Sequence, residues 1–259
     1  MAFLQIQFFS KSLVVASTVN VILPEANQGI GMGNSETKDP PAVLYLLHGY
    51  SDDHSIWMRR TSVERYAASH NLAVIMPAVN HSFYCNEIHG ERYWDYVSEE
   101  LPQVMHQFLR LSEDPGKTFV AGLSMGGYGA MRLALTHPDR FAAAASFSGA
   151  LDITGIMDRH AKDGTGARVF GEGADLRGTE VDNLYLMKKN ASAPRKPWLY
   201  VSCGTADFLY AQHQDMVPKL QETGWNVTRH DEPDATHEWG FWDQEIRKFI
   251  DMLAEKELL

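Results

Sequence analysis

The chain opens with alternating apolar and polar positions and then changes to continuous apolar runs. Residues 3–9 alternate in this way, as do residues 13–23, which predicts two half-exposed strands paired antiparallel. From residue 42 onward, short apolar runs rich in β-branched and aromatic side chains alternate with stretches of helical period. Such runs are typical of strands buried on both faces of a sheet. The expected buried strands are 43–47, 72–76, 118–121, 141–147 and 198–202, followed by a strand near 225–230.

Stretches of helical period separate these runs. The expected helices are 62–70, 94–111, 128–136, 211–223 and 241–253, with Pro102 starting or kinking a helix within the second of them. Alternating strands and helices imply an α/β fold with a doubly wound, mostly parallel sheet and right-handed crossovers. The first two strands would be antiparallel edge strands of that sheet.

A length of 259 residues fits a single α/β domain covering residues 1–259. Residues 151–195 contain six glycines and little periodicity, so we expect a loop or small lid over the active-site edge rather than a second domain. The glycines of 29–33 are expected in a solvent loop, because no buried strand precedes them and no helix follows, as a dinucleotide site requires.

Composition and charge exclude several classes of function. Apolar residues make up 44% and charged residues 22% of the chain, close to globular averages. A formal net charge of −10 argues against nucleic acid or an anionic membrane as a partner. No run of 18 apolar residues occurs, and no positive charge precedes an apolar run at the N-terminus, so we expect a cytoplasmic protein without a membrane span. Cys85 and Cys203 are far apart and are expected to be buried free thiols.

A candidate nucleophile lies in residues 118–130, where an apolar strand leads through the turn GLSMG into a helix rich in Gly and Ala. A serine on a sharp strand-to-helix turn needs neighbours without bulk, because the two backbones approach closely there. Gly122 and Gly126 meet that need around Ser124. The backbone amide of Met125 would then point where an oxyanion forms. The motif is short, and the alternative is a capping serine at a glycine-rich helix start.

The partners of a nucleophilic serine in this fold follow it in the order Asp, His. Asp207 lies on a turn directly after the buried strand 198–202, and the carboxyl ends of parallel strands are where such sheets gather functional groups. His237 lies in a loop just before the last helix. We therefore expect Asp207 and His237 to complete a catalytic triad with Ser124.

Other residues compete for the same roles. His213 is expected in a helix and His230 in a strand, so each is presented less freely than a loop histidine. Asp231 and Asp234 are near His237 in the sequence but do not directly follow a buried strand. For Asp207 itself the alternative is a helix N-cap.

The second oxyanion donor is expected from the loop after the strand 43–47. There the chain reads Leu-His-Gly-Tyr, and the backbone N–H of Tyr50 is the candidate donor, with Met125 as its partner. His48 is expected to brace this loop rather than to act as a base. No HExxH motif or other metal-ligand spacing is visible, so no metal and no cofactor are expected.

With these residues in place, the chain resembles the bacterial tributyrin esterases, of the esterase D group that includes S-formylglutathione hydrolases and feruloyl or acetylxylan esterases. The segments that carry the resemblance are LYLLHGYSDDHSIW, RYAASHNLAVIMP, SFYCN, GLSMGGYGAMRLAL, FSGALDI, CGTADFLY and THEWGFWD. The resemblance implies a serine carboxylesterase that hydrolyses acyl esters from acetyl to about butyryl without a cofactor, acetylated carbohydrates among them. It gives Ser124, Asp207 and His237 the triad roles, and Tyr50 and Met125 the oxyanion roles.

Aromatic residues of the same segments are candidates for the substrate pocket, with core packing as the alternative. They are Trp57, Phe83, Tyr84, Phe208 and Trp239, together with Trp242. The expected partner is a small-molecule ester, and the oligomeric state is open between a monomer and a homo-oligomer. A thioesterase acting on S-formylglutathione, a feruloyl-type esterase, an acyltransferase and a non-catalytic binding protein are the alternative functions.

Overall fold

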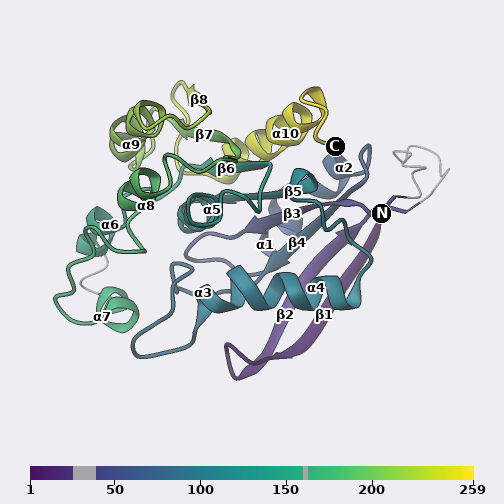
Figure 1. Cartoon of the computed structure of the whole chain (residues 1–259), viewed down its shortest axis with the longest axis horizontal. Helices are drawn as coiled ribbons and strands as arrows, with labels where there is room; N and C mark the ends of the chain where they lie inside the picture. Colours follow the sequence, from purple (N-terminus) through teal and green to yellow (C-terminus); the bar gives the residue numbers. More distant parts are fainter. Residues whose placement is uncertain (26–38, 160–162) are drawn as a thin grey trace.

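The computed structural model describes residues 1–25, 39–159 and 163–259. Within them, eight strands form one sheet in the order β1-β2-β4-β3-β5-β6-β7-β8, with helices on both faces (Figure 1). The strands are β1 (Ala2–Ser10), β2 (Val15–Leu23), β3 (Ala42–Leu47), β4 (Leu72–Pro77), β5 (Thr118–Leu123), β6 (Ala143–Phe147), β7 (Trp198–Gly204) and β8 (Val227–Glu232). The glycines of 29–33 lie outside the described residues.

The sheet is mostly parallel with an antiparallel edge. Strand β2 pairs antiparallel with both β1 and β4, and every further pair from β4 to β8 is parallel. The predicted doubly wound α/β sheet with antiparallel N-terminal edge strands is confirmed. Because the parallel strands share one direction, their carboxyl ends meet at one edge of the sheet.

Helices follow most strands, close to the predicted positions. They are α1 (Ile56–Arg60), α2 (Val63–Ala67), α3 (Tyr93–Asp95), α4 (Leu101–Phe108), α5 (Met125–Thr136), α6 (Ile153–Arg159), α7 (Thr165–Phe170), α8 (Asn183–Lys189), α9 (Tyr210–Glu222) and α10 (Trp239–Glu255). Periodicity did not predict α1 or the three short helices α6, α7 and α8, because a helix of one or two turns shows too few periods.

The helix expected over 94–111 is continuous but irregular around its proline. A π turn, Tyr96–Glu100, joins α3 to α4 just before Pro102. A proline has no N–H and its ring crowds the carbonyl four residues earlier. That carbonyl, on Ser98, accepts a hydrogen bond from the Arg140 guanidinium at 2.5 Å instead. The irregularity predicted at Pro102 is therefore a π turn. The Ser98 carbonyl, which the proline leaves without a helix donor, accepts a hydrogen bond from Arg140.

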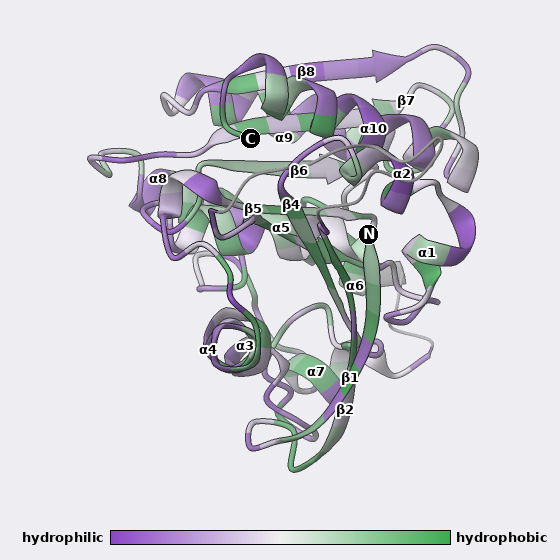
Figure 2. Ribbon diagram, turned by 90° about the vertical axis from the view of Figure 1, so that its right-hand side faces the viewer, coloured by the Kyte–Doolittle hydropathy of each residue, from purple (hydrophilic) through white to green (hydrophobic). Residues whose placement is uncertain are grey.

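The central strands are apolar on both faces because helices cover both. Val43, Tyr45 and Leu47 of β3 belong to the core on the side of α4, α5, α8 and α9. Leu44 and Leu46 belong to the core on the side of α1, α2 and α10. Figure 2 shows the central strands as hydrophobic and the helices as mixed, which is the pattern of a sheet between two helical layers.

The segment 151–195, expected as a loop or small lid, carries α6, α7 and α8. Its second half is fixed to the core, since Trp225 donates to the carbonyl of Met187 at 3.0 Å and Asn190 donates to that of Leu135 at 2.7 Å. Its first half, with α6 and α7, lies at the periphery of the molecule in Figure 1. A role of the segment as a lid stays a prediction.

The turn between β5 and α5 lies against the end of β3. A Cβ atom on Gly122 would lie 2.4 Å from the carbonyl oxygen of Gly126, and one on Gly126 would lie 2.4 Å from that of Leu47. Real Cβ atoms do not approach backbone this closely, so both positions require glycine. The close backbone approach expected around Ser124 is thus present, and it connects the β5 turn to the β3 loop.

We predict that Gly126→Ala lowers the free energy of unfolding by about 2 kcal/mol or more, because its methyl group overlaps backbone carbonyls that cannot rotate away. Urea unfolding followed by circular dichroism measures the change. The control is Gly166→Ala in α7, where the nearest atom to an added Cβ is the Met157 sulfur at 3.6 Å. Equal stability of the two variants would contradict the crowding argument.

Candidate active site

Ser124 is held in strained backbone at the first turn of α5. Its φ of 51° and ψ of −116° lie where residues other than glycine are rare. Its N–H donates to the Phe147 carbonyl at 2.9 Å, and its own carbonyl accepts from the amides of Tyr128 and Ala150, each at 3.1 Å. These three hydrogen bonds fix the serine at the N-terminus of α5, where the helix dipole carries partial positive charge.

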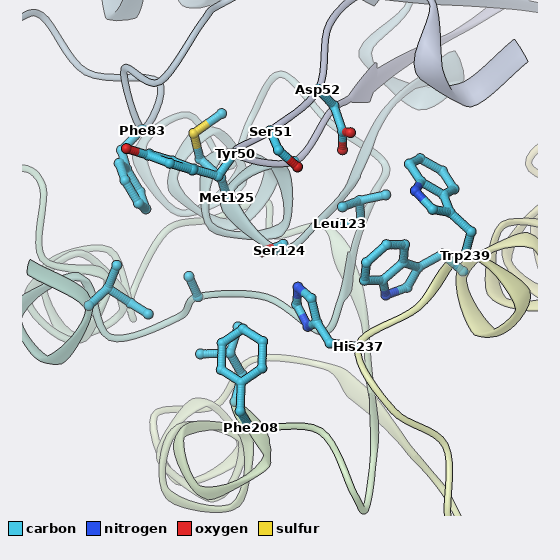
Figure 3. A pocket seen from close by; sticks show the side chains of 15 residues that line it. Tyr50, Ser51, Asp52, Phe83, Leu123, Ser124, Met125, Phe208, His237 and Trp239 are labelled. Atoms are coloured by element: carbon cyan, nitrogen blue, oxygen red, sulfur yellow. The ribbon is translucent and has the colours of Figure 1, made fainter. Parts of the chain in front are cut away.

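The structure brings Asp207 and His237 together beside this serine. Asp207 is buried after β7, and His237 precedes α10, with 2.8 Å between Nδ1 of His237 and Oδ2 of Asp207. Figure 3 shows the imidazole next to Ser124 in one cavity. The two loops meet closely, because a Cβ on Gly204 would lie 2.1 Å from the Ala235 carbonyl oxygen.

A second layer of hydrogen bonds holds the Asp207 carboxylate. Its Oδ1 accepts from the amide of Leu209 at 2.8 Å, and the Ser148 hydroxyl also donates to the carboxylate. Trp242 in turn donates its indole N–H to Ser148 Oγ at 3.1 Å. Burial raises the pKa of Asp207, but its hydrogen bond to His237, the charge of that residue and the other donors together lower it below its ordinary value. A charged Asp207 favours the tautomer of His237 with the proton on Nδ1.

A second histidine–aspartate pair lies at the same edge of the sheet. His213 in α9 contacts Asp231 with 2.8 Å between Nε2 and Oδ1, and Tyr210 and Arg229 also donate to this carboxylate. Burial is the main cause that lowers the pKa of His213. None of these residues lines the cavity of Ser124. His213 and Asp231, the alternatives to the predicted pair, therefore contact each other away from the cavity. The other candidate aspartate, Asp234, is exposed.

Three successive carbonyls of the β3 loop are each held by a side chain. Trp57 donates its indole N–H to Leu47 at 3.0 Å, and Tyr84 donates its hydroxyl to His48 at 2.9 Å. The Nδ1 of His48 itself donates to the carbonyl of Gly49 at 2.7 Å. This loop is therefore rigid where it reaches the cavity, which fixes the direction of the Tyr50 amide that follows it.

His48 braces the loop as a neutral, buried side chain. Its Nε2 accepts from the amide of Val79 at 3.0 Å while its Nδ1 donates, which leaves no place for a second proton. Burial is the main cause that lowers the pKa of His48, to about 4.

Both candidate oxyanion residues reach the cavity. Tyr50 and Met125 line it together with Ser124, one from each side of the contact between the β3 loop and α5. The Tyr50 side chain points away from that contact. Its ring stacks on His81 at 4.3 Å, and its hydroxyl shares a hydrogen bond of 2.6 Å with Thr165 at the start of α7. The tyrosine thus links the loop after β3 to the segment 151–195.

The cavity has a volume of about 400 Å³ and is walled mostly by apolar side chains. Of the aromatic residues predicted for it, Phe83, Phe208 and Trp239 line it, as does Trp242. The ring of Phe208 lies 4.5 Å and that of Trp242 4.8 Å from the imidazole of His237. Aromatic rings therefore surround the histidine on two sides.

Trp57 and Tyr84 were predicted for the pocket but do not line it. Both are fully buried, and each uses its polar end on a carbonyl of the β3 loop. Their position supports the alternative of core packing, with the physical reason that a buried carbonyl needs a donor. Sequence reasoning also missed Ile156, Leu209 and the rim residues Ser51 and Asp52, which line the cavity from α6 and two loops. Ser51, Asp52 and Leu209 lie in segments that carry the family resemblance, but the sequence of a segment does not say which of its side chains face a cavity.

Among the described residues, one group has the composition of a metal site. His230, Glu232 and Glu245 place ligand atoms within 4.8 Å of one another. The ammonium group of Lys248 already contacts Glu245 at 2.8 Å and Glu232 at 3.3 Å, so a cation of the chain itself balances these carboxylates. None of the three lines the cavity of Ser124, and the absence of a metal in the reaction stays a prediction.

Fold and site together define an α/β-hydrolase with a serine at the strand-to-helix turn. The Esterase family model matches residues 10–254. An acetyl esterase of Caldicellulosiruptor saccharolyticus is 30% identical over 264 residues, covering 98% of this chain and 99% of that relative. The chain belongs to this esterase family and is a carboxylic ester hydrolase.

Solved structures agree with this assignment. FphF, a fluorophosphonate-binding serine hydrolase of Staphylococcus aureus, is 37% identical, with a TM-score of 0.88 over 97% of this chain and 98% of its own. An S-formylglutathione hydrolase (FrmB) of the same organism is also 37% identical, with a TM-score of 0.85 over the same shares. Mycobacterium tuberculosis MPT51, at 19% identity and a TM-score of 0.78 over 98% of both chains, shares the fold. In the described part of the chain, no helix has the length and apolarity to span a membrane.

We predict that the free energy of unfolding decreases as the pH falls from about 6.5 towards about 4. In this window the unfolded chain binds a proton at His48 that the folded chain excludes, so acid favours unfolding. The contribution of His48 is on the order of 3 kcal/mol, and His213 adds to it in the same direction. Urea titrations at several pH values measure the slope. NMR of the His48 ring checks the cause, and a titration midpoint near 6.5 in the folded protein would contradict it.

Proposed function

We propose that this esterase hydrolyses short-chain acyl esters, from acetyl to about butyryl, through an acyl-enzyme on Ser124. The observation that supports this best is that His237, whose Nδ1 lies 2.8 Å from Asp207, lines the same cavity as a serine on strained backbone. The order of the three along the chain is that of an α/β-hydrolase triad. Two backbone amides at the cavity supply the remaining element of acyl transfer.

The proposed reaction has two halves. His237 takes the proton of Ser124 through Nε2 while Oγ attacks the ester carbonyl, and Asp207 stabilises the imidazolium through Nδ1. The amides of Tyr50 and Met125 donate to the oxyanion, and each such donor is typically worth about 3 kcal/mol in the transition state. The imidazolium protonates the leaving alcohol. Water, activated by the same histidine, then releases the acid.

The walls of the cavity support a small acyl group. Aromatic rings flank His237, and α6 contributes Ile156, so apolar surface surrounds the carbonyl that Ser124 would attack. Ser51 and Asp52 supply polar groups on the side of the β3 loop. Burial raises the pKa of Asp52, and a backbone hydrogen bond from Gly49 offsets part of this increase. A carboxylate and a hydroxyl at this rim suit an alcohol moiety that carries hydroxyl groups, such as an acetylated sugar.

A thioester is the second candidate substrate, because the FrmB structure at 37% identity is named as an S-formylglutathione hydrolase. The same triad serves both leaving groups, since Oγ of the serine attacks the acyl carbon in either case and the histidine protonates the oxygen or sulfur that leaves. A feruloyl-type substrate rests on the sequence resemblance alone. The cytoplasmic location and a small-molecule ester as the partner also remain proposals.

We predict that Ser124→Ala lowers kcat for p-nitrophenyl acetate at least about a thousandfold and abolishes labelling by a fluorophosphonate. Asp207→Asn should lower kcat by about ten-thousandfold, since it loses the charge that holds the histidine tautomer. The matched control is Asp231→Asn, which removes the carboxylate of the other histidine pair at the same 2.8 Å spacing. It should keep the kcat of the folded enzyme. Loss of activity in Asp231→Asn equal to that in Asp207→Asn would refute the assignment of the triad.

We predict that kcat/KM is highest for acetyl to butyryl esters and falls at least about tenfold by the octanoyl ester, because the aromatic walls beside Ser124 leave little room for a long chain. A series of p-nitrophenyl esters measures this. S-formylglutathione, assayed beside the acetyl ester, separates the two candidate substrates. A thioester kcat/KM far above that of every oxygen ester would favour the thioesterase.

A further inference from the structure

The outer edge strand of the sheet, β1, carries no charged side chain. The strand is last in the sheet order, and among the described residues none pairs with the edge that faces away from β2 (Figure 1). Its sequence over Ala2–Ser10 is AFLQIQFFS, with no charged side chain and no proline. Soluble proteins usually protect an edge strand of this length with lysines, prolines or bulges. β1 has none of these three protections, as expected of a strand that pairs with another chain.

The side chains of β1 are arranged symmetrically about Ile6. Gln5 and Gln7 flank it, and Phe3 and Phe9 lie three positions away on either side. The positions between them hold another apolar pair, Leu4 and Phe8. An antiparallel strand of the same sequence, centred on Ile6, would therefore meet a side chain of its own kind at each of these positions.

The two faces of β1 differ in a way that suits such pairing. Phe3 is 51% and Phe9 is 64% exposed on one face, an unusual exposure for two large aromatic side chains. On the other face Leu4, Ile6 and Phe8 are half-buried against the core. Figure 2 shows the β1–β2 hairpin as a largely hydrophobic ribbon at the margin of the molecule. A second strand would cover apolar surface on both faces at once.

Charge favours the same edge. Each chain carries a net charge of −10, so two copies repel each other over most of their surfaces. The nine residues of β1 contribute no charge to that repulsion. Two copies can therefore meet along this strand without placing carboxylates opposite each other.

We propose that a second copy of this chain binds along β1, antiparallel and with Ile6 opposite Ile6, so that the sheet continues from one subunit into the other. A two-fold axis perpendicular to the sheet relates the subunits. Backbone hydrogen bonds along the strand supply part of the affinity. Phe3 of one copy lies opposite Phe9 of the other, and such aromatic cross-strand pairs stabilise sheets. The interface is independent of the catalytic assignment.

The register predicts the effect of two charged variants at exposed positions. In the dimer Gln5 of one copy lies opposite Gln7 of the other. The variant Q5K/Q7K places like charges opposite each other twice and should weaken association at least about tenfold. The matched variant Q5K/Q7E places opposite charges there and should remain dimeric. Sedimentation velocity of the wild type and both variants measures the masses, and equal esterase activity in all three confirms that each is folded.

A second measurement tests the same register chemically. Chains carrying Q5C and chains carrying Q7C should form a disulfide-linked dimer when mixed, whereas each variant alone should not, because only residues 5 and 7 lie opposite each other. Native Cys85 and Cys203 are buried and do not compete. A monomeric wild type, a Q5K/Q7K variant as dimeric as the wild type, or a Q5K/Q7E variant that dissociates would each overturn the proposal.

Discussion

The contact between the start of α5 and the end of β3 is the constraint on which the rest of the site depends. Gly126 lies against the carbonyls of Leu47 and His48 with no room for a side chain. Because backbone touches backbone there, the amides of Tyr50 and Met125 are positioned relative to Ser124 without relying on flexible side chains. A comparable contact, between Gly204 and Ala235, brings the loop of the histidine to the loop of the aspartate. In the proposed mechanism, donors preorganised in this way stabilise developing charge without a cost of rearrangement at the moment of reaction.

The close backbone contact leaves buried carbonyls that require hydrogen-bond donors, and aromatic side chains supply these donors. A backbone that approaches another backbone in the core has carbonyls that no sheet or helix partner satisfies, and an unpaired buried carbonyl costs about 1–3 kcal/mol. Trp57 and Tyr84 satisfy two of them from outside the cavity. Trp242 has both kinds of role, since it lines the cavity and donates to the Ser148 hydroxyl behind Asp207. The site is rigid because the polar ends of these large side chains donate hydrogen bonds to groups within the core.

The same edge of the sheet carries two histidine–carboxylate pairs of equal spacing, which differ in their surroundings. The pair of His213 and Asp231 is tied to Tyr210 and Arg229 and does not reach the cavity. The pair of His237 and Asp207 faces the serine, with aromatic rings on two sides of the imidazole. Geometry of a pair alone does not define a catalytic base. Its position relative to a nucleophile does.

The sequence by itself determined the fold class, the order of the strands along the chain and the choice of Asp207, His237 and the loop after β3 as partners expected near the serine. Those features follow from hydrophobic period, from glycines that no other residue can replace, and from the rule that parallel strands end at one edge. The tertiary structure alone decided which aromatic residues face the cavity, that the described part of 151–195 carries α6, α7 and α8, and that Ile156 and Asp52 line the site. Trp57 and Phe83 both lie in segments that carry the family resemblance, yet one satisfies a carbonyl and the other faces the cavity. The physical reason is that burial and hydrogen bonding of a side chain depend on neighbours distant in sequence, which no local pattern encodes.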